Sequence, residues 1–246
     1  AQGNLSIQGD QLLLAGGNQV SPARFELATG KCLAGPFPQG QPKANHGKFV
    51  GVFDEKCAIV GGRTLYASPR NVANKDSFVA ATDHGTFNLV YGGIPPAWSD
   101  TTFALANFRR SKLICCDAEK VAERIGKGFQ QVPPDRRGRW NNLAQAFEAD
   151  GAVRWQSDLN EPNKFEVLSL AVCPQAVVAV VQFQNRVRAQ PQWFLAAFKA
   201  DDGTPIWFWR HELPSEPLPG GLLVDRNGHA VITLLDGSVL YYGAAG

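Results

Sequence analysis

The sequence predicts an all-β fold, a β-propeller made of four-stranded antiparallel blades. The first observation is a repeated segment: a short apolar strand, a polar turn ending in glycine, and a second strand. The second observation is that a further pair of apolar strands precedes each repeated segment, which completes a four-stranded unit. Such units cannot bury their faces alone and therefore stack radially. The repeated segments are ARFELATGKCLAG (23–35), SFVAATDHGTFNLVYG (77–92), LAQAFEADGAVRWQ (143–156) and FLAAFKADDGTPIWFW (194–209).

Each repeated segment places a glycine at the end of its turn, where a tight hairpin often needs a positive φ angle. The preceding strand pairs are carried by DQLLLAGG, KFVGVFDEKCAIVGG, TTFALANFRRSKLICC and FEVLSLAVCPQAVVAVVQF. Every unit therefore reads as strand, turn, strand, loop, strand, glycine turn and strand. The four turn glycines are Gly30, Gly85, Gly151 and Gly203.

The C-terminal stretch GGLLVDRNGHAVITLLDGSVLYYG (220–243) predicts three more strands, because Asn227-Gly228 and Asp236-Gly237 are typical hairpin turns. Four complete blades and a three-stranded fifth leave two arrangements open: a five-bladed ring closed by a terminal strand, or the C-terminal part of a larger seven- or eight-bladed propeller. A sandwich or barrel is the alternative all-β fold, but it predicts evenly alternating strands without a repeated segment. We expect a single domain with approximate blades 1–44, 45–94, 95–160, 161–214 and 215–246.

One helix is expected, beginning after Asp117 as its N-cap and ending near Gly126. We expect it in a loop between the second and third strands of its blade, followed by the stretch FQQVPPDRRGR (129–139). Its apolar residues recur at the i, i+3, i+4 and i+7 spacing of a helix face, and they are Ala118, Val121, Ala122 and Ile125.

Composition and charge exclude several classes of protein. The formal net charge is +2, and the basic clusters at 109–110 and 136–139 are short, which argues against a nucleic-acid partner. No run of eighteen apolar residues is present, so no membrane-spanning helix is expected. The first residues do not read as a signal peptide, and position 1 is not Met, which suggests a processed or internal start.

Candidate catalytic and metal-binding side chains do not form a recognisable motif. The five cysteines lack the CxxC pairs of a zinc site, and no DxDxDG calcium loop occurs. We therefore predict no catalytic residues and no metal site. The scattered histidines are His46, His84, His211 and His229, and the loop aspartates are Asp100, Asp117, Asp135 and Asp158.

At the repeated turns the chain resembles the pyrroloquinoline-quinone-like (PQQ-like) β-propeller repeat family, whose unit is roughly Ala-x-Asp-x-x-Thr-Gly-x-x-x-Trp. Residues 28–31, Ala-Thr-Gly-Lys, match the turn, and Gly151 and Gly203 are each followed four residues later by Trp155 and Trp207. The resemblance implies that these tryptophans dock one blade on the next. It leaves activity open, since the family includes quinone-dependent dehydrogenases, assembly scaffolds of the bacterial outer membrane and proteins without any cofactor. Most such relatives are exported, which implies the periplasm or the cell surface.

The adjacent pair Cys115 and Cys116 permits two interpretations. The dehydrogenases of this resemblance carry a vicinal disulfide against the quinone, and a cysteine near a helix N-terminus gains thiolate character. Cysteine is also one of the residues most often buried, and successive strand residues point to opposite faces, so each could fill a different blade interface. The sequence favours the second interpretation.

The leading hypothesis is a non-catalytic PQQ-like propeller that acts as a protein-interaction or scaffold domain of an exported bacterial protein. Its partner would be another protein or the missing part of the same propeller, and it would need no cofactor. The alternative is a quinone-dependent alcohol or sugar dehydrogenase, or a fragment of one, with PQQ and Ca²⁺ beneath Cys115 and Cys116. Neither the rest of a quinone site nor a CxxCH haem attachment sequence can be assembled from the residues.

Overall fold

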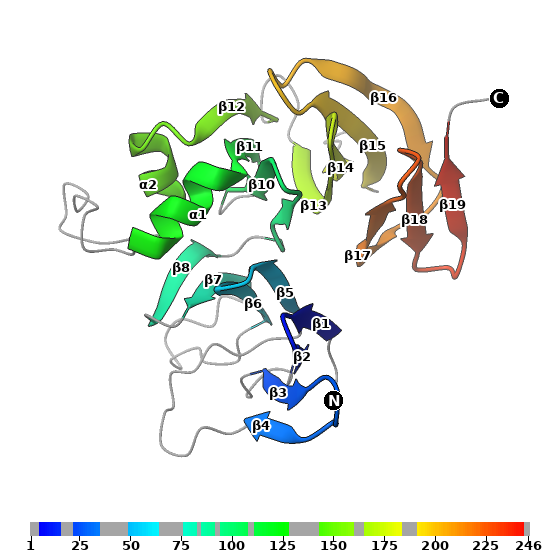
Figure 1. The fold of residues 1–246 in the computed structure, drawn as a ribbon. Helices are drawn as coiled ribbons and strands as arrows, with labels where there is room; N and C mark the ends of the chain where they lie inside the picture. The colour runs from blue at the N-terminus through cyan, green and yellow to red at the C-terminus, as the bar shows by residue number, and fades with distance from the viewer. Residues whose placement is uncertain are drawn as a thin grey trace, which may run out of the picture. The chain divides into compact units, whose positions relative to one another are not determined.

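The computed structural model has an all-β fold, as the sequence predicts (Figure 1). Its strands form antiparallel sheets in which neighbours along the sequence are also neighbours in the sheet, and two short helices accompany them. The chain divides into two compact units, Ala1–Gly93 with Ala122–Ala146 and Ile94–Val121 with Phe147–Gly246, and each is described by itself. The structure describes residues 5–15, 22–34, 49–63, 76–82, 85–91, 94–107, 111–127, 143–159, 165–183 and 191–243.

The first unit contains two four-stranded sheets that pack through their first strands. The Ser6 hydroxyl donates a 2.8 Å hydrogen bond to the Val50 carbonyl, and the Gln8 amide donates one of 3.1 Å to the Asp54 carbonyl. Leu13 and Val50 lie in one buried cluster between the sheets. The sheets are β1 (Leu5–Gln8), β2 (Gln11–Leu14), β3 (Ala23–Glu26) and β4 (Cys32–Ala34), then β5 (Phe49–Asp54), β6 (Cys57–Arg63), β7 (Asp76–Thr82) and β8 (Gly85–Tyr91).

The second unit contains three sheets in succession. Two have four strands, and the last has three in the described residues. The first strand of the middle sheet contacts the first strands of both neighbours. The sheets are β9 (Ala97–Trp98), β10 (Thr102–Ala106), β11 (Lys112–Asp117) and β12 (Val153–Asp158); β13 (Phe165–Cys173), β14 (Ala176–Phe183), β15 (Gln192–Lys199) and β16 (Pro205–Leu213); and β17 (Pro217–Val224), β18 (Ala230–Leu234) and β19 (Val239–Tyr242).

The middle sheet of the second unit is buried on both faces, which explains the unbroken apolar run AVVAVV at its second strand. Successive side chains of a strand point to opposite faces. Val177 accordingly packs with the β9–β12 sheet, whereas Val178 packs with the β17–β19 sheet. On β15 the same alternation sends Phe194 to the first interface and Leu195 to the second. Each interface is therefore built from alternate residues of the same strands.

The expected strand at 143–149 is wrong, because these residues form helix α2 (Leu143–Ala149). The heptapeptide LAQAFEA consists almost wholly of strong helix formers, and this local preference outweighs the repeat. The β9–β12 sheet still has four strands, because the two-residue strand β9 precedes β10. The hairpins β3–β4, β7–β8 and β15–β16 occur at the other three repeated segments, as expected.

The expected helix is confirmed as α1 (Ala118–Lys127), which ends one residue beyond the predicted Gly126. The Asp117 carboxylate accepts a 3.2 Å hydrogen bond from the Lys120 amide and so caps the first turn. Val121 and Ile125 are buried, as the spacing predicts. The helix lies between the third and fourth strands of its sheet, β11 and β12, rather than between the second and third. The stretch 129–139 lies outside the described residues.

Three of the predicted turn glycines have positive φ angles: 70° at Gly30, 65° at Gly151 and 73° at Gly203. Gly85 differs, because it is the first residue of β8 and is paired with Thr82. In the described residues, neither helix is long and apolar enough to cross a membrane.

The two faces of β18 allow a matched test of this packing. Ile232 is fully buried between two sheets, whereas Val231 points to the opposite face. We expect Ile232→Ala to lower the free energy of unfolding by about 2–5 kcal/mol, through lost transfer energy and a residual cavity. Val231→Ala should cost less than about 1 kcal/mol. Chemical denaturation of the two variants measures this, and equal losses would contradict the assignment of the faces.

Candidate functional site

The most specific contact between sheets is made by Trp155, which lies on β12 and is buried. Its indole Nε1 donates a 2.9 Å hydrogen bond to the carbonyl oxygen of Ala200, in the turn that follows β15 of the next sheet. Its ring lies 6.0 Å from that of Phe198, centroid to centroid. The indole therefore buries its apolar body against the neighbouring sheet and satisfies its only polar group there.

Gly203 makes this contact possible. A Cβ atom placed on Gly203 would lie 2.6 Å from Cδ2 of Trp155 and 2.8 Å from its Cε3, inside the distance at which atoms collide. The positive φ of 73° independently disfavours a side chain at this position. The turn must therefore carry glycine for two reasons, its backbone conformation and the indole that lies against it.

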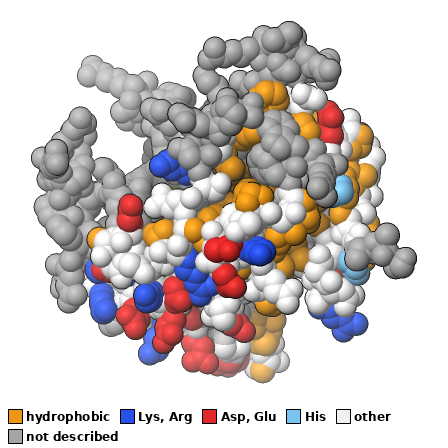
Figure 2. Space-filling view, turned by 90° about the horizontal axis from the view of Figure 1, so that it is seen from above, with side chains coloured by type: hydrophobic (Ala, Val, Ile, Leu, Met, Phe, Trp, Pro, Cys, Tyr) orange, Lys and Arg blue, Asp and Glu red, His pale blue; other side chains and the backbone are white. Residues whose placement is uncertain are grey.

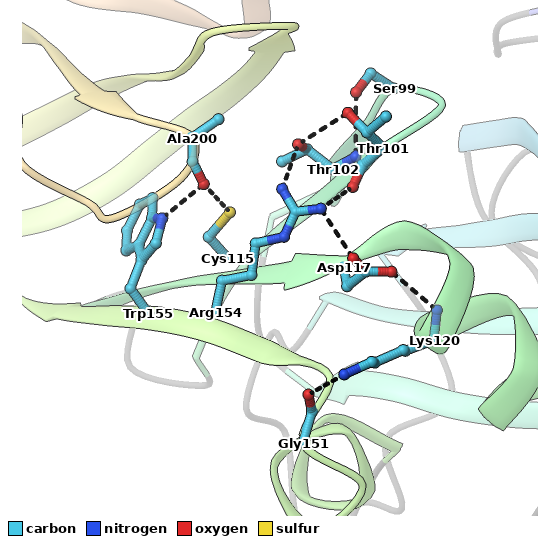
Figure 3. A network of polar contacts seen from close by, with 10 residues as sticks. All are labelled: Ser99, Thr101, Thr102, Cys115, Asp117, Lys120, Gly151, Arg154, Trp155 and Ala200. Carbon is cyan, nitrogen blue, oxygen red and sulfur yellow. Dashed lines mark hydrogen bonds and ion pairs between the residues drawn. The ribbon is translucent and has the colours of Figure 1, made fainter.

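Cys115 and Cys116 are buried free thiols on β11. The Cys115 thiol donates a 3.5 Å hydrogen bond to the same Ala200 carbonyl that Trp155 binds, as Figure 3 shows. Cys115 pairs with Trp155 across the sheet, Cys116 pairs with Val153, and the register shifts between the two cysteines. Cys115 belongs to the core between the β9–β12 and β13–β16 sheets.

Burial raises the pKa of both thiols. The pKa of Cys115 is raised to about 11 and that of Cys116 to about 12, and in each case desolvation outweighs the lowering influence of nearby Arg154. Thiolate is the reactive form of cysteine, so these groups are poor nucleophiles near neutral pH. Neither thiol has the electropositive, exposed setting of a redox-active cysteine.

Arg154 joins three parts of the β9–β12 sheet at one of its ends (Figure 3). Its Nη2 atom lies 2.9 Å from Oδ2 of Asp117 and donates a 2.8 Å hydrogen bond to the Thr101 carbonyl. Its Nη1 atom donates a 3.3 Å hydrogen bond to the Thr102 hydroxyl. The hydrogen bond from Arg154 is the main reason that the pKa of Asp117 is lowered. The sequence did not reveal this network, because single arginine and aspartate residues far apart in the chain carry no signal.

Trp207, the second tryptophan of the repeat, lies on β16 and packs at the next interface, against the core between the β13–β16 and β17–β19 sheets. Its ring meets the His211 ring edge-on at 5.4 Å. His211 in turn lies 5.0 Å from Tyr242 of β19. Both tryptophans predicted for docking therefore lie at interfaces between successive sheets.

The structure does not gather the other candidate residues into one site. His229 lies 3.0 Å from Oδ2 of Asp225 within one turn and also contacts Tyr241. Asp100 is exposed. Within the part of the chain that the structure describes, no three His, Cys, Asp or Glu side chains converge as metal ligands would. His46, His84 and Asp135 lie outside the described residues, as does the side chain of Asp158.

Comparisons with known proteins bear on the fold alone. No family model matches the chain, and no curated protein matches it. Among solved structures, it is similar to one titled as a complex of KlAtg21 with the coiled coil of AgAtg16, with a TM-score of 0.52 at 10% sequence identity. The match covers 98% of this chain and 65% of the other. The chain thus spans about two-thirds of the length of the WD40-type protein that it matches.

The contact between Trp155 and Gly203 can be tested with a matched pair of glycines. Gly203→Ala and Gly30→Ala both place a side chain at positive φ, but only the first places it against the indole. We expect Gly203→Ala to lower the free energy of unfolding by about 1–3 kcal/mol more than Gly30→Ala, as overpacking does. Chemical denaturation checks this. The excess should disappear when Trp155→Ala is combined with Gly203→Ala, and its persistence would contradict the steric explanation.

The buried thiols should resist modification. Near neutral pH, we expect alkylation of Cys115 and Cys116 in the native protein to be at least about tenfold slower than alkylation of the exposed Cys32, because both access and thiolate formation are suppressed. Peptide mass spectrometry of the labelled protein measures the three rates. Rapid labelling of the pair, or a disulfide between them that only reduction opens, would contradict the assignment.

Proposed function

We propose that the chain is a non-catalytic, PQQ-like β-propeller segment that acts as a protein-interaction or scaffold domain of an exported bacterial protein. Its surroundings would be the periplasm or the cell surface, as the resemblance of its turns implies. Its partner would be another protein or the rest of a larger propeller. The observation that carries this proposal is that the sheets stack one after another and leave an apolar face uncovered at each end of the series.

The stacking within each unit supports a radial arrangement of blades. The first strand of one sheet contacts the first strand of the next, as in β1 with β5 and in β13 with both β9 and β17. Trp155 then ties the fourth strand of one sheet to the turn between the third and fourth strands of the next. This combination of inner-strand contact and tryptophan docking is what blades around an axis require.

The uncovered faces belong to the first and last sheets. On β1, Leu5 and Ile7 are 59% and 56% exposed, on the face opposite the buried Leu13. On β19, Val239 and Tyr241 are 63% and 61% exposed, opposite the face that packs on the β13–β16 sheet. Exposed apolar side chains gathered on one sheet face are typical of an interaction surface.

Partial coverage of the matched structure supports the same conclusion. That protein is WD40-type, its title describes a protein complex, and its chain is longer than this one. Figure 2 shows one face of the molecule, on which acidic and basic side chains are interspersed around exposed hydrophobic ones. Such a surface suits protein contacts better than the broad basic face that nucleic acid requires.

The residues do not fit the quinone site of the alternative. Under that hypothesis the sulfurs of Cys115 and Cys116 would lie against a cofactor. The Cys115 thiol instead binds the Ala200 carbonyl within a packed interface, and both thiols are buried. In the described residues no carboxylate cluster stands near them to hold Ca²⁺. No observation favours the dehydrogenase over the scaffold.

Site-specific photocrosslinking tests the proposal. A photoreactive benzoylphenylalanine in place of Tyr241 would lie on the uncovered face of the last sheet, and one in place of Arg226 would lie in a polar turn of the same sheet. We expect cells producing the protein to give a discrete crosslinked product from the first position and little from the second. No product from Tyr241, or alcohol oxidation that depends on added PQQ and Ca²⁺, would overturn the proposal.

A further inference from the structure

The turn between β3 and β4 repeats the backbone of the turn that Trp155 covers. In both turns the residue before the turn, the first turn residue and the glycine donate equivalent hydrogen bonds, and the glycine φ angles are 70° and 73°. The pairs are Glu26 N to Lys31 O at 2.9 Å with Lys199 N to Thr204 O at 2.9 Å, Leu27 N to Asp10 O at 2.7 Å with Ala200 N to Gln175 O at 3.0 Å, and Gly30 N to Glu26 O at 2.8 Å with Gly203 N to Lys199 O at 3.0 Å.

By this equivalence the Leu27 carbonyl corresponds to the Ala200 carbonyl, but its surroundings differ. The Ala200 carbonyl accepts hydrogen bonds from an indole and a thiol. In the part of the chain that the structure describes, no group donates a hydrogen bond to the Leu27 carbonyl. A Cβ atom placed on Gly30 would meet no described atom within 4 Å, where one on Gly203 meets the Trp155 ring. The first turn has the form of the second without the tryptophan.

The sheet face beside this turn is apolar and uncovered. Ile7 pairs with Leu12, which pairs with Phe25, so these three side chains form a row on one face. Phe25 occupies the place that Phe198 has beside Trp155. The opposite face is taken by Leu13, which packs on the β5–β8 sheet. An incoming sheet would thus find an apolar face and a free carbonyl acceptor together.

We propose that the β3–β4 turn is a docking site for a tryptophan from a further β-sheet, with the Leu27 carbonyl accepting the indole N–H over Gly30 and Phe25. The proposal deepens the proposed function and rests on it, since it names the partner of the first uncovered face. The partner is a four-stranded sheet whose outer strand carries tryptophan four residues after its turn glycine, as in the sheet that carries Trp155.

A second copy of this chain does not meet that requirement. Its two tryptophans that follow a turn glycine by four residues are Trp155 and Trp207, and both lie within interfaces of the chain itself. The last sheet, which faces outward in the right sense, has no fourth strand in the described residues. The occupant is therefore a sheet other than the five of this chain.

The test uses a cyclised hairpin peptide that contains GAVRWQSD, the sequence of 151–158, and a version with its tryptophan replaced by alanine. Backbone amide shifts of the isotope-labelled protein are followed during titration with each peptide. We expect saturable shifts at Ala28, Gly30 and Lys31 with the tryptophan peptide only. Loss of one hydrogen bond and its stacking corresponds to at least about fivefold weaker binding.

Two variants make the result specific. Gly30→Asn should keep the turn, because asparagine tolerates positive φ, while its side chain occupies the space of the indole. Gly237→Asn makes the same change in the β18–β19 turn and is the matched control. We expect binding to be lost in the first and retained in the second. Equal shifts with both peptides, equal shifts in both variants, or no shifts at millimolar peptide would each overturn the proposal.

Sedimentation of the unlabelled protein supplies the remaining arm. If the protein self-associates and Gly30→Asn abolishes the association, the occupant is a second copy, and the proposed partner is wrong. Failure at this turn is distinguishable from failure of the proposed function, because crosslinking from Tyr241 reports on the other uncovered face.

Discussion

The structure of the second unit depends on one backbone carbonyl. The Ala200 oxygen accepts hydrogen bonds from the Trp155 indole and the Cys115 thiol, both donated by the preceding sheet. Hydrophobic packing alone is non-directional and would let two sheets slide over one another. A buried acceptor with two donors fixes the register of the contact, because any shift would leave buried polar groups unpaired. The apolar residues supply most of the burial, and this carbonyl sets where they meet.

Position within the fold also explains the chemistry of the cysteines. A thiol that fills a packed interface between two sheets is kept protonated by desolvation, and Cys115 behaves as a small apolar side chain with one weak hydrogen bond. Adjacent cysteines on a strand would suggest a redox pair only if the strand ended there in an exposed turn. In this chain α1 begins two residues after Cys115, but the strand pairing continues through both cysteines.

The sequence was informative wherever local pattern and tertiary position agreed. The glycine turns at Gly30 and Gly203 and the capped helix after Asp117 follow from residue types whose backbone preferences act locally. The strand expected at 143–149 was wrong because the repeat was trusted over helix propensity, which here prevailed. The shared Ala200 carbonyl and the Arg154 network could not be predicted, since they join residues 37 to 85 positions apart through atoms that no single-sequence pattern marks. Whether the sheets form a closed propeller, and what partner they bind, lies beyond what residue patterns specify.

The position of the two helices has a consequence for the order of folding. Strands β15 and β16 are joined by residues 200–204, whereas β11 and β12, equally adjacent in their sheet, are joined by residues 118–152. Closing a connection about seven times longer costs roughly 2 kcal/mol more in chain entropy, and contacts of long sequence separation form late. Strand β12 carries Trp155, so the middle sheet can complete its own hairpins before the tryptophan arrives. Folding then proceeds from a finished acceptor turn to a late-arriving donor strand.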